Sequence, residues 1–113
     1  MMKDNLVFLR HILECINNIE KDTKNYDKEK FKKIRRTQDA VIRNLEIIGE
    51  AAKNISEEFR ESYPEIPWKK MASLRDKLIH FYFGVDIDIT WNVVREDLPN
   101  LKRSINKIVQ EEL

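Results

Sequence analysis

The chain has 113 residues, which is enough for one domain of ordinary size and too few for two. Hydrophobic residues make up 42% and charged residues 36%, and only two glycines and three prolines interrupt the chain. This composition is typical of long solvated helices and argues against a loop-rich or all-β domain. With 21 Lys and Arg against 20 Asp and Glu, the net charge of +1 excludes a protein that binds polyanions over its whole surface, although it allows a local basic patch.

The sequence shows no targeting segment and no membrane span. The start Met1-Met2-Lys3-Asp4 is not followed by an apolar run, and no apolar run approaches the roughly 18 residues that a bilayer requires. We therefore expect a cytoplasmic protein with no membrane contact. The lone Cys15 excludes an intramolecular disulfide and a cysteine-built zinc site, and its helical surroundings predict a buried structural thiol.

Two helices are predicted in the first half of the chain. Asp4 caps the first, which ends around Asn25–Tyr26; its apolar residues recur at helical spacing and are Leu6, Leu9, Leu13, Ile16 and Ile19. Asp27 caps the second, which runs without a break to Ile55; its inward-facing residues are Phe31, Ile34, Gln38, Val41, Ile42, Leu45, Ile48 and Ala52. Gly49 lies among alanines and aliphatic residues, so it indicates close helix packing and not a break.

The connector between the two halves is the Pro-containing stretch 63–67. Ser56 begins a short helix before it, and Pro67 suits the first turn of a third helix that extends from Trp68 to about Phe83. Gly84 ends that helix.

A fourth helix opens at Asp88 or Thr90, and Pro99 is expected to kink it or split it in two. Its apolar residues are Trp91, Val94, Leu98, Leu101, Ile105 and Ile108. Residues 1–113 are thus predicted to form a single all-α domain. We expect a four-helix up-down bundle with a short extra helix and a kinked last helix.

The predicted third helix carries two apolar stripes. One is an ordinary core stripe of Met71, Leu74, Leu78 and Phe81. The other lies on a different arc and mixes apolar with polar side chains, namely Trp68, Ala72, Arg75, Asp76, Ile79, His80 and Phe83. A bundle needs only the first stripe, so the second predicts a partner surface with polar chemistry embedded in it.

Asp76 and His80 are four residues apart and therefore neighbours on one helix face. A carboxylate in that position orients the imidazole and favours its protonated form. Arg75 and His80 are less well aligned on an ideal helix. They would converge on one phosphate through their long side chains, through a local distortion, or through contributions from two chains.

Residues 75–82 spell Arg-x4-His-x-Tyr, and here the sequence resembles the HEPN domains, specifically the HepT-like toxin ribonucleases. The resemblance covers most of the chain from about Asp39 onward, whereas the first helix is generic. The further segments that carry it are Arg43–Ala52, Ile66-Pro67-Trp68, Val85-Asp86, and Trp91 with Leu98-Pro99 and Leu101.

This resemblance implies a metal-independent endoribonuclease that acts as a homodimer on single-stranded RNA and needs no cofactor. In such enzymes an Arg and a His drive the neighbouring 2′-hydroxyl onto the phosphorus, which assigns catalysis here to Arg75 and His80. The residues suit the reaction, because a His near neutral pKa can move a proton and an Arg can stabilise the phosphorane. A two-fold dimer through Trp68, Ile79 and Phe83 would place two Arg75–His80 pairs in one cleft.

Tyr82 has a separate implied role. In HepT-like proteins the motif tyrosine is adenylylated by a partner nucleotidyltransferase of the MNT type, the antitoxin of a type VII-like toxin–antitoxin system. AMP beside Arg75 would mask the cation and block the entry of RNA. Without the resemblance, Tyr82 is equally well a tyrosine at the edge of the core with an exposed hydroxyl.

Other charged residues allow two interpretations each. Without the family, Arg75, Asp76 and His80 would be a surface ion cluster. The basic run of the second helix is typical of a solvated face, or else it tracks RNA phosphates or docks an acidic partner; it comprises Lys28, Lys30, Lys32, Lys33, Arg35 and Arg36. Lys69 and Lys70 lie near the expected cleft and are candidates for guiding RNA. We interpret His11, which lies between Leu9 and Ile12, as structural.

The alternative function is a non-catalytic helical accessory subunit that binds a nucleotidyltransferase. The intact Arg-x4-His favours the enzyme, since a degenerate motif would favour the accessory subunit. Asp76 departs from many relatives, which carry Asn at that position. A carboxylate there repels phosphate unless His80 is protonated, so we expect Asp76 to support His80 at some cost in activity. No cluster of His, Asp and Glu has metal-ligand spacing, and we expect no metal.

Overall fold

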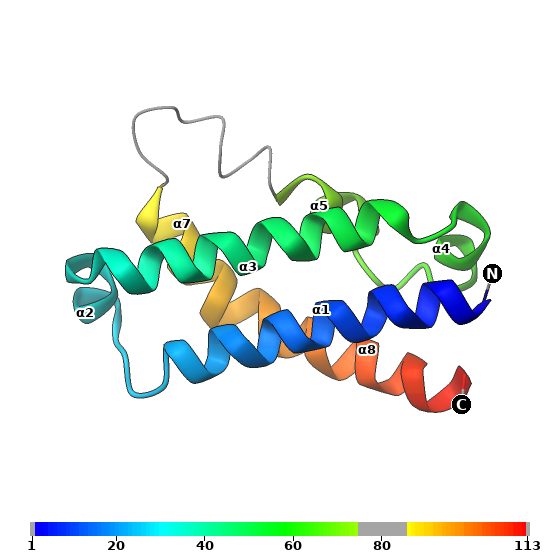
Figure 1. Cartoon of the computed structure of the whole chain (residues 1–113), viewed down its shortest axis with the longest axis horizontal. Helices are drawn as coiled ribbons and strands as arrows, with labels where there is room; N and C mark the ends of the chain where they lie inside the picture. The colour runs from blue at the N-terminus through cyan, green and yellow to red at the C-terminus, as the bar shows by residue number, and fades with distance from the viewer. Residues whose placement is uncertain (1, 75–85, 113) are drawn as a thin grey trace.

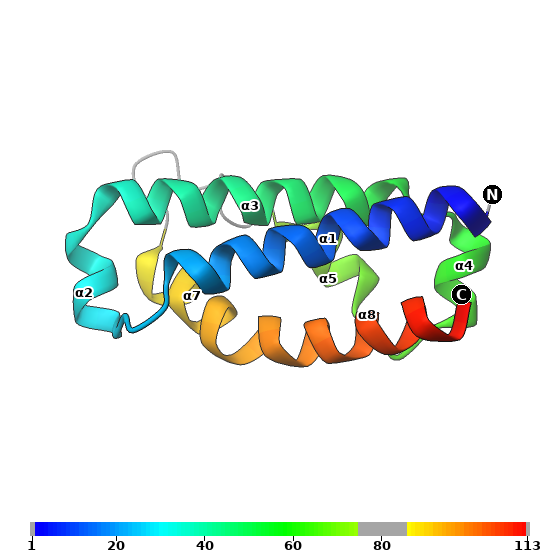
Figure 2. The same cartoon turned by 60° about the horizontal axis from the view of Figure 1, so that its bottom comes forward.

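The computed structural model describes residues 2–74 and 86–112, and every regular element within these ranges is helical. The molecule measures 42 × 29 × 19 Å. Three long helices follow its long axis: α1 (Met2–Asp22), α3 (Arg35–Asn54) and α8 (Leu98–Glu112) (Figure 1). Figure 2 shows α1 between α3 and α8, and α1 contacts both of them. The predicted all-α class is confirmed.

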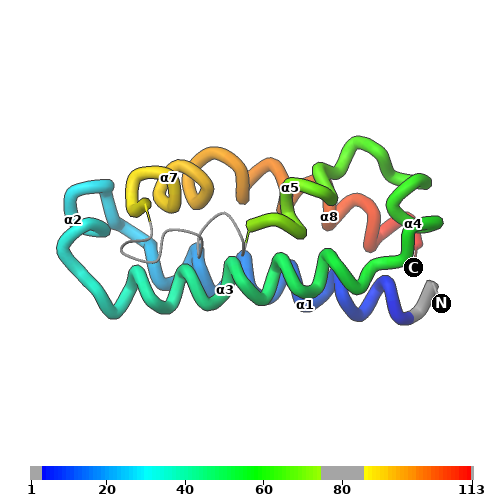
Figure 3. The backbone as a smooth tube through the Cα atoms, turned by 90° about the horizontal axis from the view of Figure 1, so that it is seen from above, coloured from blue at the N-terminus to red at the C-terminus, as the bar shows by residue number. Residues whose placement is uncertain are grey.

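Short helices complete the bundle. One end is closed by α2 (Lys28–Lys33) and the other by α4 (Glu57–Ser62), beside which both termini lie (Figure 1). Figure 3 shows α5 (Trp68–Ala72) and α7 (Ile87–Asn92) on the same side of α3, with α7 toward the α2 end and α5 toward the α4 end. None of the described helices contains a stretch that is long and apolar enough to span a bilayer.

Each long helix buries one apolar stripe, as the spacing predicts. On α1 the fully buried residues are Leu9, Ile12, Ile16 and Ile19. On α3 the stripe is Val41, Leu45, Ile48 and Ala52, and Gly49 is buried within a helix that continues past it. The predicted stripe of the last helix is buried along its whole length, from Trp91 to Ile108.

The first helix starts and ends earlier than predicted. Asp4 lies inside the first turn of α1 instead of capping it, a position where its negative charge interacts favourably with the helix dipole. The helix ends at Asp22, and the Thr23 hydroxyl donates to the Ile19 carbonyl at 2.8 Å. Asn25 then takes a positive φ of 65°, which turns the chain toward α2.

The prediction of one unbroken second helix is wrong. Asp27 does cap a helix, its carboxylate accepting from the Lys30 N–H at 2.8 Å, but that helix is α2 and ends at Lys33. Ile34 is extended, with φ −111° and ψ 96°. The buried Gln38 amide donates to the Phe31 carbonyl at 2.9 Å and the Lys32 carbonyl at 3.0 Å. The side chain thus satisfies carbonyls that a continuing helix would have satisfied.

The predicted short helix after Ser56 is α4, and Ser56 caps it by accepting from the Phe59 N–H at 3.2 Å. The third helix differs from its prediction: α5 begins after Pro67 as expected but ends at Ala72. Its C-cap is Ser73, whose hydroxyl donates to the Lys70 carbonyl at 2.9 Å. Such local side-chain bonds compete with helix continuation. The predicted continuation to Phe83 lies outside the described residues.

The last helix is kinked, as Pro99 predicts. Asp86, and not Asp88, caps α7, its carboxylate accepting from the Ile89 N–H at 3.1 Å. One turn of π-helix, η1 (Val93–Asp97), then leads into α8. Proline has no N–H and clashes with the carbonyl four residues before it, so the wider turn directly before Pro99 accommodates the ring.

Candidate functional site

The predicted catalytic chemistry falls on a segment outside the described residues. This holds for all the motif and interface residues of that segment, namely Arg75, Asp76, Ile79, His80, Tyr82 and Phe83. The structure does describe where the chain enters and leaves the segment. Leu74 follows α5 on one side, and Asp86 caps α7 on the other. The surroundings of the candidate site can therefore be built from its two flanks.

Trp68 anchors the entry flank. It is 7% exposed, and its indole N–H donates to the Tyr63 carbonyl at 2.9 Å. Its ring meets Phe59 edge-on, with centroids 6.4 Å apart. Trp68 is therefore a core residue of its own chain, which leaves little of it for the predicted contact with a second protomer.

Lys69 and Lys70 are exposed on the same short helix, as a role in guiding RNA requires. The Lys70 ammonium lies 3.7 Å from the Asp97 carboxylate of η1. A cavity of about 210 Å³ opens beside this pair, between α5 and the start of α8, and Leu74 forms part of its wall. Since Leu74 precedes Arg75 in the chain, this cavity adjoins the segment that carries the motif.

An aromatic stack fixes the exit flank. The Trp91 ring lies 5.0 Å from the Phe31 ring of α2, and the Arg95 guanidinium lies 4.4 Å from the Trp91 ring centre. Arg95 also donates to the Tyr26 carbonyl before α2. The fully buried Thr90 donates its hydroxyl to the Asp86 carbonyl at 2.9 Å. The bond of Thr90 joins α7 to its own N-cap, whereas the contacts of Trp91 and Arg95 hold this part of the chain against α2.

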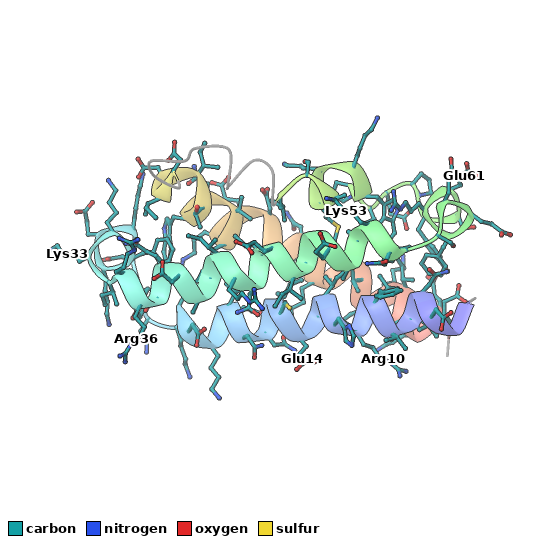
Figure 4. All side chains as sticks on the ribbon, turned by 45° about the horizontal axis from the view of Figure 1, so that its top comes forward. Arg10, Glu14, Lys33, Arg36, Lys53 and Glu61 are labelled. Atoms are coloured by element: carbon teal, nitrogen blue, oxygen red, sulfur yellow. The ribbon has the colours of Figure 1, made fainter. Side chains whose placement is uncertain are left out.

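The basic run therefore lies beside the exit of the motif segment. Asp88 of α7 accepts ion pairs from Lys28 at 3.1 Å and Lys32 at 3.3 Å, and hydrogen bonding from the two ammonium groups lowers the pKa of Asp88. Figure 4 shows two further cations of this end, Lys33 and Arg36, projecting outward from it. Cationic groups thus flank both the entry and the exit of the segment, Lys69 and Lys70 on one side and α2 on the other.

Two residues near the site were missed by sequence reasoning. Asp97 was not a candidate because its pairing with Lys70 joins distant parts of the chain. Arg95 was not a candidate either, although its position four residues after Trp91 was a usable signal for a cation–aromatic contact.

Two further predictions concern residues of α1. Cys15 is buried at 6% exposure, as predicted, and burial together with the nearby Glu14 raises the pKa of its thiol. His11 is exposed, with its ring edge-on to Phe8 at 6.4 Å between centroids. His11 therefore contributes to the surface of α1, on a helix other than the two that flank the candidate site.

Known proteins similar to this chain agree on one family. Residues 12–108 match the family described as Ribonuclease HepT-like. The chain is 49% identical over 108 residues to a "Probable ribonuclease HepT" of Thermococcus cleftensis, an alignment that covers 96% of this chain and 98% of the relative. It is 45% identical over 112 residues to the "Putative RNase TTE0752" of Caldanaerobacter subterraneus, covering 98% and 99%.

A longer relative is similar to this chain over half of its own length. The "Gamma-glutamylcyclotransferase and putative RNase MJ0434" of Methanocaldococcus jannaschii is 53% identical over 111 residues, and this chain spans half the length of that relative. No solved structure gives a significant match. The family match covers most of the chain and two relatives align over nearly their whole length, so the chain belongs to the HepT-like ribonucleases of the HEPN class, as its motif predicted.

Proposed function

We propose that this endoribonuclease is the toxin of a type VII-like toxin–antitoxin pair and that it cuts single-stranded RNA without a metal. The observation that carries the proposal is the intact Arg75-x4-His80-x-Tyr82 motif in a chain whose residues 12–108 match the HepT-like ribonucleases. The cations that flank this segment on α5 and α2 support it, because they would attract the RNA backbone from both sides.

The proposed reaction is an attack by the 2′-hydroxyl on the adjacent phosphorus. One His80 removes the proton from the 2′-hydroxyl, and the 2′-oxygen bonds to phosphorus as the bond to the 5′-oxygen breaks. The departing 5′-oxygen takes a proton from a second imidazole, which leaves a 2′,3′-cyclic phosphate. Arg75 stabilises the negative charge of the phosphorane. His11 lies on α1, which does not flank the motif segment, so the second imidazole is best supplied by His80 of the partner subunit in a homodimer.

The proposed control acts on Tyr82. Its phenolic oxygen attacks the α-phosphorus of ATP on a partner nucleotidyltransferase, loses its proton and releases pyrophosphate. The resulting AMP ester adds negative charge and bulk to a residue that lies seven positions after Arg75 in the sequence. Mass spectrometry of the protein incubated with ATP and a nucleotidyltransferase of the MNT type tests this step. We expect added AMP on wild type and none on Tyr82→Phe.

The activity is tested on total cellular RNA in EDTA, with wild type, His80→Ala and His11→Ala compared. We expect the His80 variant to lose about 10²- to 10⁴-fold in rate, the usual contribution of a general acid or base. His11→Ala is the matched control, because it removes an exposed imidazole from α1, and it should cut like wild type. If no protein cuts while Tyr82 is free of AMP, the chain is instead an accessory subunit of a nucleotidyltransferase.

A further inference from the structure

The cavity between α5 and α8 has an apolar wall and a polar rim. The wall comprises Met71, Leu74 and Leu101, which are 3%, 6% and 7% exposed. The polar residues of the lining, which are more exposed than the wall, are Glu65, Lys70, Asp97, Asn100 and Ser104. A flat ring with apolar faces and hydrogen-bonding edges matches such a lining, because the faces contact the wall while the edges reach the rim.

The volume limits what this cavity can hold. A volume of about 210 Å³ is room for one flat ring system. A nucleobase is a flat ring system, and in a ribonuclease it arrives attached to a phosphate. Lys70 lies at the rim of the cavity, where it can bind that phosphate.

The ion pair between Lys70 and Asp97 is weak enough for Lys70 to change partners. Lys70 and Asp97 are 58% and 47% exposed and lie 3.7 Å apart, so their attraction is weak. A phosphate that binds Lys70 replaces the carboxylate as its partner. Asp97 then faces the cavity as a group that can only accept hydrogen bonds.

An acceptor-only carboxylate selects among the four bases. Guanine presents two neighbouring donors on one edge, the N1–H and the N2 amino group, and these can bind both oxygens of a carboxylate. Adenine and cytosine present one amino group on that edge, and uracil presents one ring N–H. Asn100 does not compete for this role, because its side-chain oxygen accepts from Arg103 and its amide nitrogen donates to the Glu96 carbonyl.

We propose that this cavity is a base-binding subsite of the ribonuclease, and that Asp97 makes guanine its preferred occupant. The base belongs to the nucleotide next to the cleaved phosphate, because the wall of the cavity includes Leu74, which is bonded to Arg75. The inference rests on the proposed ribonuclease function and adds a sequence preference to it.

The test measures binding with the His80→Ala protein, which is expected to leave RNA intact. The probes are fluorescein-labelled RNA octamers of uridine that carry one central guanosine, inosine or adenosine, beside octauridine itself. We expect the guanosine octamer to bind about tenfold more tightly than octauridine. Inosine, which lacks the amino group, should fall between them.

Two further variants isolate the carboxylate. Asp97→Asn should bind the guanosine octamer no more tightly than octauridine. The readout is the ratio of these two affinities, because the loss of a negative charge raises the affinity for every RNA. Glu20→Gln is the matched control, since Glu20 is also a half-exposed carboxylate paired with a lysine, Lys102, at 2.8 Å. That variant should keep the tenfold ratio. Equal affinity of all four octamers for the His80→Ala protein overturns the subsite.

Cleavage of the same octamers by wild type separates this inference from the proposed function. Cleavage without preference, unchanged in Asp97→Asn, overturns the subsite and leaves the ribonuclease standing. Guanosine-selective binding without cleavage supports the subsite and counts against the ribonuclease. Ser104→Phe, which fills the cavity from its rim, should abolish the preference. If it instead changes the mass of the assembly in sedimentation while the affinities stay, the cavity is a protein contact and the inference is wrong.

Discussion

Two short helices, α2 and α4, close the two ends of the bundle by the same means. Each has six residues and a side chain that caps it from the preceding position, Asp27 for α2 and Ser56 for α4. Each also inserts one phenylalanine into the core, Phe31 at 0% exposure and Phe59 at 4%. In both ends an aromatic partner then contacts that ring, Trp91 for Phe31 and Tyr63 for Phe59, with centroids 5.0 Å apart.

A long polar side chain secures the backbone at each end. Gln38 of α3 donates to two carbonyls of α2. Arg60 of α4 donates to carbonyls at the end of α3, namely those of Ala52, Lys53 and Ile55, at 2.9–3.0 Å. At each end, therefore, one side chain from the neighbouring helix donates hydrogen bonds to carbonyls that the helix terminus leaves unpaired.

The two ends differ in charge. The sequence of α2 is Lys-Glu-Lys-Phe-Lys-Lys and that of α4 is Glu-Glu-Phe-Arg-Glu-Ser. Because capping, aromatic burial and carbonyl pairing are the same, the fold does not require either sign of charge. The basic sign is found at the end where α7 leaves the motif segment, which is where a polyanionic substrate would benefit from it.

The largest effect is expected from removing the buried rings. Phe31→Ala and Phe59→Ala should each lower the free energy of unfolding by about 3–5 kcal/mol, since both rings leave a cavity in a packed core. Urea denaturation followed by circular dichroism measures this loss. Phe8→Ala is the control, because Phe8 is only half-buried, and it should cost clearly less. A loss below about 1 kcal/mol for either buried ring would show that its end of the bundle is not packed as described.

The next effect is expected from the two side chains that pair with helix-end carbonyls. Gln38→Met and Arg60→Met keep most of the side-chain volume and remove the donors, so each should cost about 1–3 kcal/mol. Hydrogen exchange should show the loosening locally, around residues 28–38 for Gln38 and around residues 52–60 for Arg60. Arg60→Lys is the control, because it keeps the charge but cannot reach several carbonyls at once. Full stability of Arg60→Lys would mean that the charge alone matters.

The Gln38 contact also explains why the sequence predicts one helix where the structure has two. Phe31, Ile34 and Val41 keep helical spacing across the break between α2 and α3. The apolar pattern therefore gives no sign that Ile34 is extended. The available signal was a polar residue on the buried stripe, Gln38 itself, since a buried amide must find partners. Pro99, by contrast, predicts the kink correctly, because its effect is local and independent of tertiary packing.

The candidate site also has one part that the sequence predicts and one part that it does not. The motif from Arg75 to Tyr82 is readable because the residue types and their spacing lie within one short stretch. The cavity beside Lys70 cannot be predicted from the sequence. Its wall is formed jointly by α5, η1 and α8, and it depends on how the kink places Asp97 and Leu101. Spacing within one helix predicts which side chains share a face, whereas a cavity depends on the shape left between helices.

A smaller effect, on RNA binding, tests the charge difference between the two ends. Changing three exposed cations of the α2 end to Gln should weaken single-stranded RNA binding about tenfold and reduce the slope of log affinity against log salt by about 2, since roughly 0.7 is lost per phosphate contact. The three residues are Lys30, Lys33 and Arg36. Fluorescence anisotropy at several salt concentrations, with the His80→Ala background to prevent cleavage, measures both quantities.

The matched control removes the same amount of charge from other exposed positions. These positions are Arg10, Lys53 and Lys107, of which the first two are visible in Figure 4 away from the α2 end. The control variant should keep its affinity within about threefold and should unfold at the same urea concentration as the α2 variant. An equal loss of affinity in both variants would mean that net charge alone governs binding and that α2 is an ordinary solvated face.

The smallest effect concerns the acidic end, where the Tyr63 hydroxyl donates to the Glu112 carboxylate and so joins α4 to the end of α8. This hydrogen bond, with burial and the nearby carboxylates, raises the pKa of Tyr63 to about 12. Because the folded pKa lies above the unfolded value near 10, the stabilisation is complete below pH 10 and is lost as the pH rises through 12. Tyr63→Phe should therefore cost about 0.5–1 kcal/mol at pH 7, a modest value because the pair is half-exposed.

Urea titrations at several pH values measure the difference in the free energy of unfolding between wild type and Tyr63→Phe, and this gap should narrow above pH 10. In Glu112→Gln the phenolate absorbance of Tyr63 should develop at lower pH. A gap that stays constant or widens toward pH 12 would show that the hydroxyl does not stabilise this end through its bond to Glu112.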